Sequence, residues 1–160
     1  MCSIAGMINF KKNYLNYKSY NKLLVRDMAE SMRHRGPDSY GEWVGEHAAF
    51  AHTRLAVIDP EGGKQPMTRT VEGYEFAITY NGELYNTDEL RRELIKYGYE
   101  FSTTSDTEVL LYAYIHYGEK CAERFNGIYA FCVWDSMRQR VFACRDRFGV
   151  KRFFYTILGG

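Results

Sequence analysis

The amino-acid sequence predicts an α+β fold, and three observations support this prediction. A chain of 160 residues is long enough for one compact domain and short for two. Aromatic side chains make up 16% of the residues and, with 14 glycines, favour a strand-rich core. Segments with strand and helix periodicity follow one another without strict alternation, which argues against a parallel βαβ arrangement.

The first third of the chain predicts one strand and one amphipathic helix. Ser3–Phe10 has the β-branched and apolar composition of a strand, and a polar loop over residues 11–16 follows it. A helix is expected over Tyr20–Arg33, ended by Gly36-Pro37. Its core-facing side chains recur at the helical period: Leu23, Leu24, Met28 and Met32.

Seven more strands and two capped helices are predicted in the remainder. Asn86 with Glu89 has the pattern of a helix start, and that helix stops at Gly98. Ser105 with Glu108 repeats the pattern, and its helix stops at Gly118. The expected strands are Gly41–Val44 with Ala48–Ala51 as a hairpin, Leu55–Ile58, Glu75–Tyr80, Ile128–Asp135 with Arg140–Arg145 as a hairpin, and Phe153–Leu158.

Composition excludes several classes of function. Lys and Arg number 21 and Asp and Glu number 20, so the net charge of +1 favours neither nucleic acid nor a membrane surface as a partner. Hydrophobic residues at 46% and charged residues at 26% are typical of a folded domain. No apolar run is long enough to span a bilayer, and the N-terminus has no basic leader, so we expect a cytoplasmic protein.

The four cysteines are too scattered for a metal site or a disulfide framework. Cys2, Cys121, Cys132 and Cys144 form no C-x-x-C pair and have no clustered histidines, so we expect no bound metal. Cys132 and Cys144 lie in apolar strand contexts and are interpreted as small core residues. The core is also expected to contain the aromatic side chains Tyr129, Phe131, Trp134, Phe142, Phe153 and Phe154.

Cys2 is the candidate nucleophile. Removal of Met1 would make it the first residue, with its α-amine beside its thiol. An α-amine has a pKa of roughly 7.7 to 8.0 and can accept the thiol proton near neutral pH. A cysteine at position 2 can also be an accident of sequence, and a pair with His34, His47, His52 or His116 is an alternative that the sequence alone does not test.

Three further positions carry polar groups that suit a binding site. Asn81-Gly82 follows a predicted strand, where an amide side chain and a backbone N–H can form an oxyanion hole, although Asn-Gly is also a common turn. Arg54 borders an apolar run and requires a carboxylate partner. Asp106 lies at a predicted helix start, where capping is the simpler role.

Eight short motifs, each weak alone, are specific through their order along the chain. They are Met1–Gly6, His34–Asp38, His52–Asp59, Gln65–Met67, Tyr80–Asn86, Thr103–Glu108, Asn126–Phe131 and Arg145–Lys151. Together they resemble the glutaminase domain of glutamine-hydrolysing asparagine synthetases over nearly the whole chain. The family usually continues the last motif with Pro-Leu-Tyr, whereas Arg152-Phe153-Phe154 follows here.

The resemblance implies a class II glutamine amidotransferase with the N-terminal-nucleophile hydrolase fold, a four-layer αββα sandwich of mainly antiparallel sheets. It implies that residues 1–160 form the glutaminase domain without its last strands, and that an ATP-dependent synthetase domain of the same polypeptide is absent. No cofactor is expected in this domain, whereas ATP and Mg would bind the synthetase domain. The implied partners are L-glutamine and that synthetase domain, with a homodimer as a further candidate assembly.

The same resemblance assigns roles to individual residues. Cys2 would attack the side-chain amide of glutamine and form a thioester, with Asn81 and Gly82 as the oxyanion hole. Arg54 would bind the α-carboxylate and Asp106 the α-ammonium. Backbone groups of four residues would line the pocket: Leu55, Val57, Ile58 and Glu83. The ammonia would serve asparagine synthesis from aspartate; a related acceptor, or a silent module that retains Met1, is the alternative.

Overall fold

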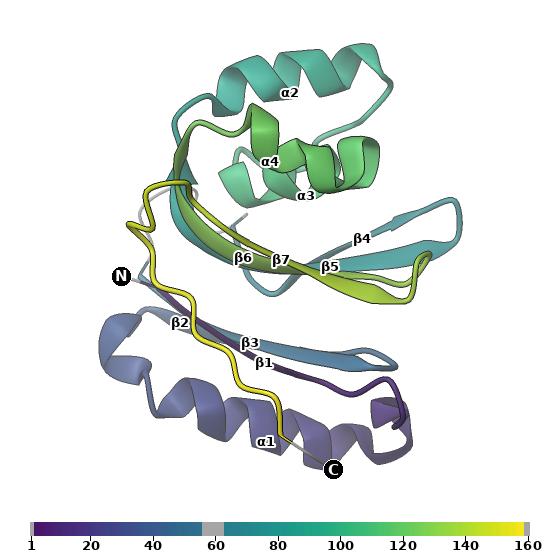
Figure 1. Ribbon diagram of the computed structural model, residues 1–160, viewed down its shortest axis with the longest axis vertical. Helices are drawn as coiled ribbons and strands as arrows, with labels where there is room; N and C mark the ends of the chain where they lie inside the picture. The colour runs from purple at the N-terminus through teal and green to yellow at the C-terminus, as the bar shows by residue number, and fades with distance from the viewer. Residues whose placement is uncertain (1, 56–62, 159–160) are drawn as a thin grey trace.

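The computed structural model describes residues 2–55 and 63–158 and arranges them in four layers. Figure 1 shows helix α1 against one sheet, a second sheet stacked on the first, and helices α2, α3 and α4 over the outer face of the second sheet. The expected αββα sandwich of antiparallel sheets is therefore confirmed. Within the described part of the chain, no helix is both long and apolar enough to cross a bilayer.

The first sheet has three antiparallel strands in the order β1-β3-β2. They are β1 (Ser3–Ile8), β2 (Ser39–Val44) and β3 (Ala48–Arg54). Every residue of the central strand β3 is buried, because α1 (Lys18–Glu30) covers one face of this sheet and the second sheet covers the other. A short 3-10 helix, Tyr14–Tyr17, precedes α1, and another, Arg33–Arg35, follows it.

The predicted core face of α1 was wrong. Leu23 is 53% exposed and Met28 is 41% exposed, whereas Asn21, Val25 and Ala29 form the buried stripe. The sheet beneath α1 presents small side chains such as those of Ala49 and Ala51, so small residues on the helix pack closely against it. Asn21 is satisfied in this interface because its side-chain amide donates to Tyr14 O at 2.8 Å.

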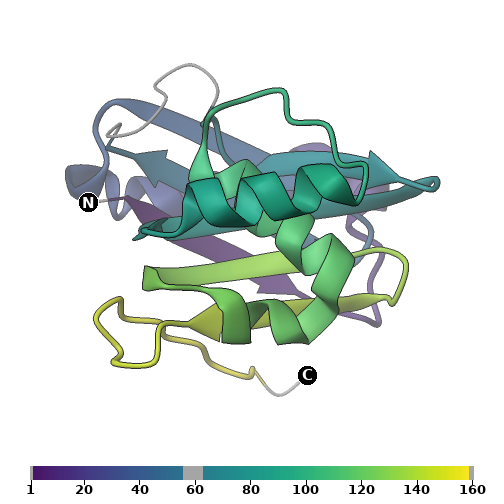
Figure 2. The ribbon, with the colours of Figure 1, turned by 90° about the horizontal axis from the view of Figure 1, so that it is seen from above.

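The second sheet has four antiparallel strands in the order β4-β5-β6-β7. Its strands are β4 (Met67–Val71), β5 (Tyr74–Leu84), β6 (Gly127–Asp135) and β7 (Arg140–Arg145). The helices on its outer face are α2 (Thr87–Lys96), α3 (Asp106–Tyr117) and α4 (Cys121–Arg124), with a 3-10 turn at Gly118–Lys120. Seen from above in Figure 2, α2, α3 and α4 lie over this sheet, and their apolar side chains form the largest core cluster with it.

A smaller apolar cluster joins the two sheets. Phe50 of β3 and Trp134 of β6 meet there across Ala48 and Ala77. Of the aromatic side chains expected in the core, Tyr129, Phe131 and Trp134 are buried, whereas Phe154 is 84% exposed. The four layers thus contain three apolar interfaces, and each sheet contributes apolar side chains from both of its faces.

The helix ends agree only in part with those predicted from the sequence. Ser105 caps α3 as expected, its hydroxyl accepting from Thr107 N at 3.1 Å, and Gly98 and Gly118 adopt positive φ where the helices stop. Asn86 makes no cap for α2. Its side chain instead donates to Arg124 O at the end of α4 and accepts from Asn126 N in the loop before β6.

One predicted strand is absent from the structure, and another lies mostly outside the described residues. Phe153–Leu158 forms no strand and most of its side chains are exposed. Leu55 lies beyond the end of β3 and is 38% exposed, while residues 56–58 lie outside the described part of the chain. Apolar composition alone predicted the strand at Phe153–Leu158, but a strand also requires a neighbour for its backbone groups.

Glu108 fixes the segment that leads into α3. Its side chain is fully buried and accepts from Ser102 N at 3.0 Å, from Thr103 N at 2.8 Å and from the Arg69 guanidinium at 2.6 Å. Burial raises the pKa of this carboxyl, but these donors outweigh burial and lower it to about 2. The predicted capping role of Glu108 is replaced by this network, which ties α3 to Arg69 of β4.

We predict that Glu108→Gln lowers the free energy of unfolding by about 3 kcal/mol, because the partly buried Arg69 loses its counter-charge and the fully buried position 108 loses a charge-assisted hydrogen bond. The control Glu119→Gln breaks an exposed ion pair with Arg140 and should cost less than about 1 kcal/mol. Denaturant unfolding measures both. The folded pKa lies below the unfolded one, so the carboxylate stabilises the fold above about pH 4.5 and this contribution disappears as the pH falls toward 2. Equal losses in the two variants would contradict the assignment.

Candidate active site

A cavity of about 170 Å³ opens where the C-terminal end of β3 lies next to the C-terminal end of β5. Cys2, Arg54 and Leu55 reach it from the first sheet. The second sheet and the start of α3 supply Tyr80, Asn81, Gly82, Glu83, Ser105, Asp106, Thr107 and Ile128, and Gly63, Gln65 and Lys151 complete the wall. The structure therefore brings together all the predicted site residues that it describes, whereas Val57 and Ile58 lie outside the described residues.

The Cys2 thiol lies beside the backbone of Leu55. Its Sγ is 3.4 Å from Leu55 N and 3.5 Å from Leu55 O, and the side chain is partly exposed. The next residue, Ser3, begins β1 and its hydroxyl bonds that of Thr53. Pairing of β1 with β3 thus places the thiol next to Arg54, which is 6% exposed.

The Asn81-Gly82-Glu83 segment lies inside strand β5, which extends beyond the predicted end at Tyr80 to Leu84. Both the expected strand end and the alternative of a turn were therefore wrong. β4 pairs with β5 only as far as Ile78, so beyond that point no strand among the described residues lies along one edge of β5. The backbone groups on this edge are available to side chains and to the cavity.

Hydrogen bonds identify which amides occupy the uncovered edge. Tyr80 N donates to Gln65 Oε1 at 2.6 Å and Leu84 N donates to Asp106 Oδ2 at 3.3 Å, so both point away from β6. Alternate residues of an antiparallel strand share this direction. Tyr129, the partner of Gly82 on β6, likewise directs its N–H outward to Asp146. The Gly82 N–H therefore points from the uncovered edge toward the cavity, between the two occupied amides.

Position 82 has no room for a side chain. A Cβ there would lie 2.3 Å from Ile128 O and 2.7 Å from Tyr129 Cα, both on the neighbouring strand. Any larger residue would separate β5 from β6, which would move the amide of residue 82.

Asp106 is the buried carboxylate of the cavity. It begins α3, is 8% exposed, and its Oδ2 accepts from the Tyr80 hydroxyl at 2.7 Å as well as from Leu84 N. Burial raises the pKa of Asp106, and these donors oppose the rise. The carboxyl is thus bound across β5 rather than acting only as a helix cap.

His52 joins the two sheets beside the cavity. It is buried on β3, and its Nε2 lies 3.0 Å from Tyr80 O on β5, so Nε2 donates. Burial lowers the pKa of His52 to about 4, which leaves the imidazole neutral at pH 7. No histidine lines the described cavity, so the structure does not support a Cys2–His pair.

Comparison with known proteins decides the family. All of residues 1–160 match the family described as a glutamine amidotransferase domain. The chain belongs to this family. It is 50% identical over 156 residues to asparagine synthetase [glutamine-hydrolyzing] 3 of Bacillus subtilis, which covers 98% of this chain and 25% of that protein. It is 42% identical over 158 residues to asparagine synthetase [glutamine-hydrolyzing] 1 of the same organism, which covers 99% of this chain and 24% of that protein.

A solved structure supports the fold. The allosteric regulatory enzyme of purine biosynthesis matches the amidotransferase domain with a TM-score of 0.55 and 28% sequence identity, over 67% of this chain and 25% of that one. The expected N-terminal-nucleophile fold is thus confirmed. The chain spans about a quarter of the length of the curated relatives that it matches.

Two of the wall residues that the sequence did not identify as site residues, Gln65 and Tyr80, make hydrogen bonds between distant segments. Gln65 and Tyr80 both occur in the motifs that carry the resemblance, but neither type suggests catalysis by itself. Gln65 bridges Tyr80 N and the Thr107 hydroxyl, the second contact measuring 3.2 Å, and so connects β5 to the first turn of α3. Their contribution depends on hydrogen bonds between distant segments, which no local pattern shows.

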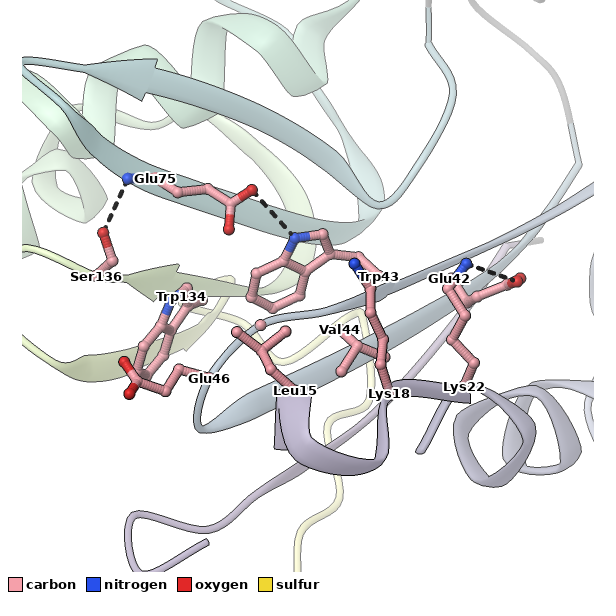
Figure 3. Close-up of a pocket in the computed structure, with 11 residues that line it drawn as sticks. Leu15, Lys18, Lys22, Glu42, Trp43, Val44, Glu46, Glu75, Trp134 and Ser136 are labelled. Carbon is pink, nitrogen blue, oxygen red and sulfur yellow. Dashed lines mark hydrogen bonds and ion pairs between the residues drawn. The ribbon is translucent and has the colours of Figure 1, made fainter. Parts of the chain in front are cut away.

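The amidotransferase domain has a second, larger cavity of about 420 Å³ at the opposite end of β5 (Figure 3). Trp43 and Trp134 line it, and the Trp43 indole N–H donates to Glu75 Oε1 at 3.5 Å. Glu42 pairs there with Lys22 at 3.6 Å. This cavity contains neither a cysteine nor a histidine, so its greater volume does not make it the reactive site.

We predict that the imidazole of His52 has a pKa near 4 and that its neutral form carries the proton on Nε2. An NMR titration of the histidine side chains measures both. The signal should vanish in His52→Gln. The folded pKa lies below the unfolded one, so His52 favours the folded state above about pH 6.5 and this contribution is lost as the pH falls toward 4. A His52 signal that titrates near 6.5 would contradict its burial against Tyr80 O.

Proposed function

We propose that this chain hydrolyses glutamine to glutamate and ammonia at Cys2, in the cytoplasm, and that the full-length protein uses the ammonia for asparagine synthesis from aspartate. One observation carries the proposal: the Cys2 thiol, the Gly82 N–H and the Asp106 carboxylate converge on one cavity in a chain of the amidotransferase family. A nucleophile, an oxyanion donor and an ammonium-binding group are the minimum set for attack on the amide of a bound amino acid.

The reaction begins once Met1 is removed, because only then is the Cys2 nitrogen a basic amine. This amine accepts the thiol proton as Sγ bonds to the side-chain amide carbon of glutamine. The Asn81 amide and the Gly82 N–H stabilise the oxyanion, and loss of one such donor typically costs about 3 to 4 kcal/mol of barrier. The carbon–nitrogen bond then breaks, and the protonated amine gives its proton to departing ammonia.

Water completes the cycle. The neutral α-amine accepts a proton from water as its oxygen adds to the thioester carbonyl, the carbon–sulfur bond breaks, and glutamate leaves with the thiol restored. The oxyanion donors act in both steps because the charge develops on the same oxygen.

Arg54 and Asp106 suit the two charges of the amino-acid end of glutamine. The Arg54 guanidinium can bind the α-carboxylate with two parallel hydrogen bonds, and Asp106 can bind the α-ammonium. Backbone groups of Leu55 and Glu83, which line the cavity, supply further contacts, with Val57 and Ile58 proposed from the resemblance alone.

The fate of the ammonia rests on the relatives rather than on this cavity. Both curated relatives above are named glutamine-hydrolysing asparagine synthetases. We infer that residues 1–160 are the glutaminase domain of a longer polypeptide whose synthetase domain binds ATP and Mg. A related acceptor acid remains the alternative, and assaying ammonia transfer to aspartate in the full-length protein distinguishes the two.

We predict that chain lacking Met1 releases ammonia from glutamine and that Cys2→Ala lowers this rate by about 10³-fold or more, because the nucleophile is gone. Cys144→Ala, a control on β7 away from the cavity, should keep the parent rate. Intact-mass measurement establishes that Met1 is absent in each sample. Equal ammonia release by Cys2→Ala and the parent would refute the assignment of the nucleophile. If the parent chain without Met1 releases no ammonia, the result would favour an interaction module without catalytic activity.

We predict that Arg54→Ala and Arg54→Lys both weaken glutamine binding by roughly 10- to 100-fold, since a bidentate charge-assisted contact is lost. Calorimetry in a Cys2→Ala background measures binding without turnover. Arg33→Ala is the control because Arg33 is exposed and pairs only locally with Glu30, unlike Arg69, which is bound to buried Glu108. Comparable losses for Arg54→Ala and Arg33→Ala would exclude the carboxylate contact.

A further inference from the structure

The Tyr80 hydroxyl is the side-chain donor that holds Asp106 against β5. Tyr80 is 2% exposed, lies on the cavity wall, and donates to Asp106 Oδ2 at 2.7 Å. Leu84 N donates to the same oxygen at 3.3 Å. Two donors on one carboxylate oxygen orient the group in the wall of the cavity.

The position of Tyr80 does not depend on this hydroxyl. Its backbone N–H is bound by Gln65 and its carbonyl by His52, and strand pairing with Phe131 fixes the residue between them. The ring is packed in the core cluster beneath α3. Removing the hydroxyl oxygen alone should therefore leave the fold and the Gly82 amide in place while it removes one donor from Asp106.

The surroundings of Asp106 make this donor important. Burial favours the neutral carboxylic acid, and the Tyr80 hydroxyl is the largest opposing influence, ahead of the Leu84 amide. The ionisable groups that face the same cavity are Cys2, Arg54, Tyr80, Glu83 and Lys151. Arg54 and Lys151 carry positive charge and Glu83 negative charge, and they belong to three separate segments.

We propose that the Tyr80 hydroxyl is a specificity-determining positioning group: it keeps Asp106 ionised and aimed so that the site selects a substrate that carries a protonated α-ammonium. This proposal rests on the proposed function, because it assigns Asp106 to the ammonium of glutamine. The ligand class is an α-amino acid, as opposed to the same amide without its amino group.

The test compares Tyr80→Phe with the parent in a Cys2→Ala background, using calorimetry with two ligands. Glutamine carries the α-ammonium, and glutaramate is the same molecule without it. Tyr114→Phe is the matched control, because the Tyr114 hydroxyl donates to buried Asp135 at 2.9 Å in the same helix–sheet core but away from the cavity. In the Cys2 chain, kcat for glutamine measures chemistry separately from binding.

Tyr80→Phe should weaken the binding of glutamine roughly tenfold at pH 6, which is the scale of one hydrogen bond to a charged group. It should change the affinity for glutaramate by less than about twofold. The loss should shrink toward pH 8.5, because without the Tyr80 donor Asp106 ionises at a higher pH and a more basic solution restores its charge. Tyr114→Phe should leave both affinities unchanged, and kcat of Tyr80→Phe should stay within about threefold of the parent.

Equal losses for glutamine and glutaramate, a loss independent of pH, or an unchanged glutamine affinity would each overturn the proposal. These outcomes differ from failure of the proposed function. A chain without Met1 that binds glutamine but releases no ammonia would refute the hydrolysis and leave the binding comparison informative. A parent chain that binds neither ligand would overturn both.

Discussion

Beyond Ile78, the described part of the chain gives strand β5 a neighbouring strand on one side only, because pairing with β4 ends there. The backbone groups on the uncovered side still require partners, and the protein supplies them from distant segments: Gln65 for Tyr80 N, His52 for Tyr80 O and Asp106 for Leu84 N. Each partner belongs to a different layer or loop. Satisfying one strand edge therefore assembles the cavity, and the Gly82 amide between the occupied groups becomes the donor that faces it.

The remaining structure holds these partners in place. His52 lies two residues before Arg54 on β3, so its bond to β5 fixes the first sheet, and with it Cys2, relative to the second. Glu108 anchors residues 102 and 103 ahead of Asp106, and this buried network determines where α3 begins. Binding and chemistry then use groups that the fold orients before a substrate arrives, which lowers the entropic cost of reaction.

Local chemistry predicted much of this arrangement from the sequence. Three predicted features depend only on neighbouring residues and were confirmed: the ends of α2 and α3 at glycines, the Ser105 cap and the β6–β7 hairpin. The buried face of α1 was not predictable in this way, because the small side chains of the sheet beneath it select Val25 and Ala29 over larger apolar residues. Likewise Asn81-Gly82 has the composition of a turn, and only pairing with β6 makes it part of a strand. The ordered motifs identified Cys2, while Tyr80 required the hydrogen-bond network.

Covalent labelling tests the central claim most directly, namely that the assembled cavity directs Cys2 to the side-chain carbonyl of a bound amino acid. A glutamine analogue with a chloromethyl ketone in place of its amide should alkylate the chain lacking Met1 once, at the Cys2 sulfur with loss of chloride, and glutamine should protect against it. Burial raises the pKa of Cys121 and Cys132 to about 12 and also raises that of Cys144, so these thiols should remain unmodified. Peptide mass spectrometry locates the adduct. Labelling of another cysteine, or none at Cys2 once Met1 is removed, would contradict the account.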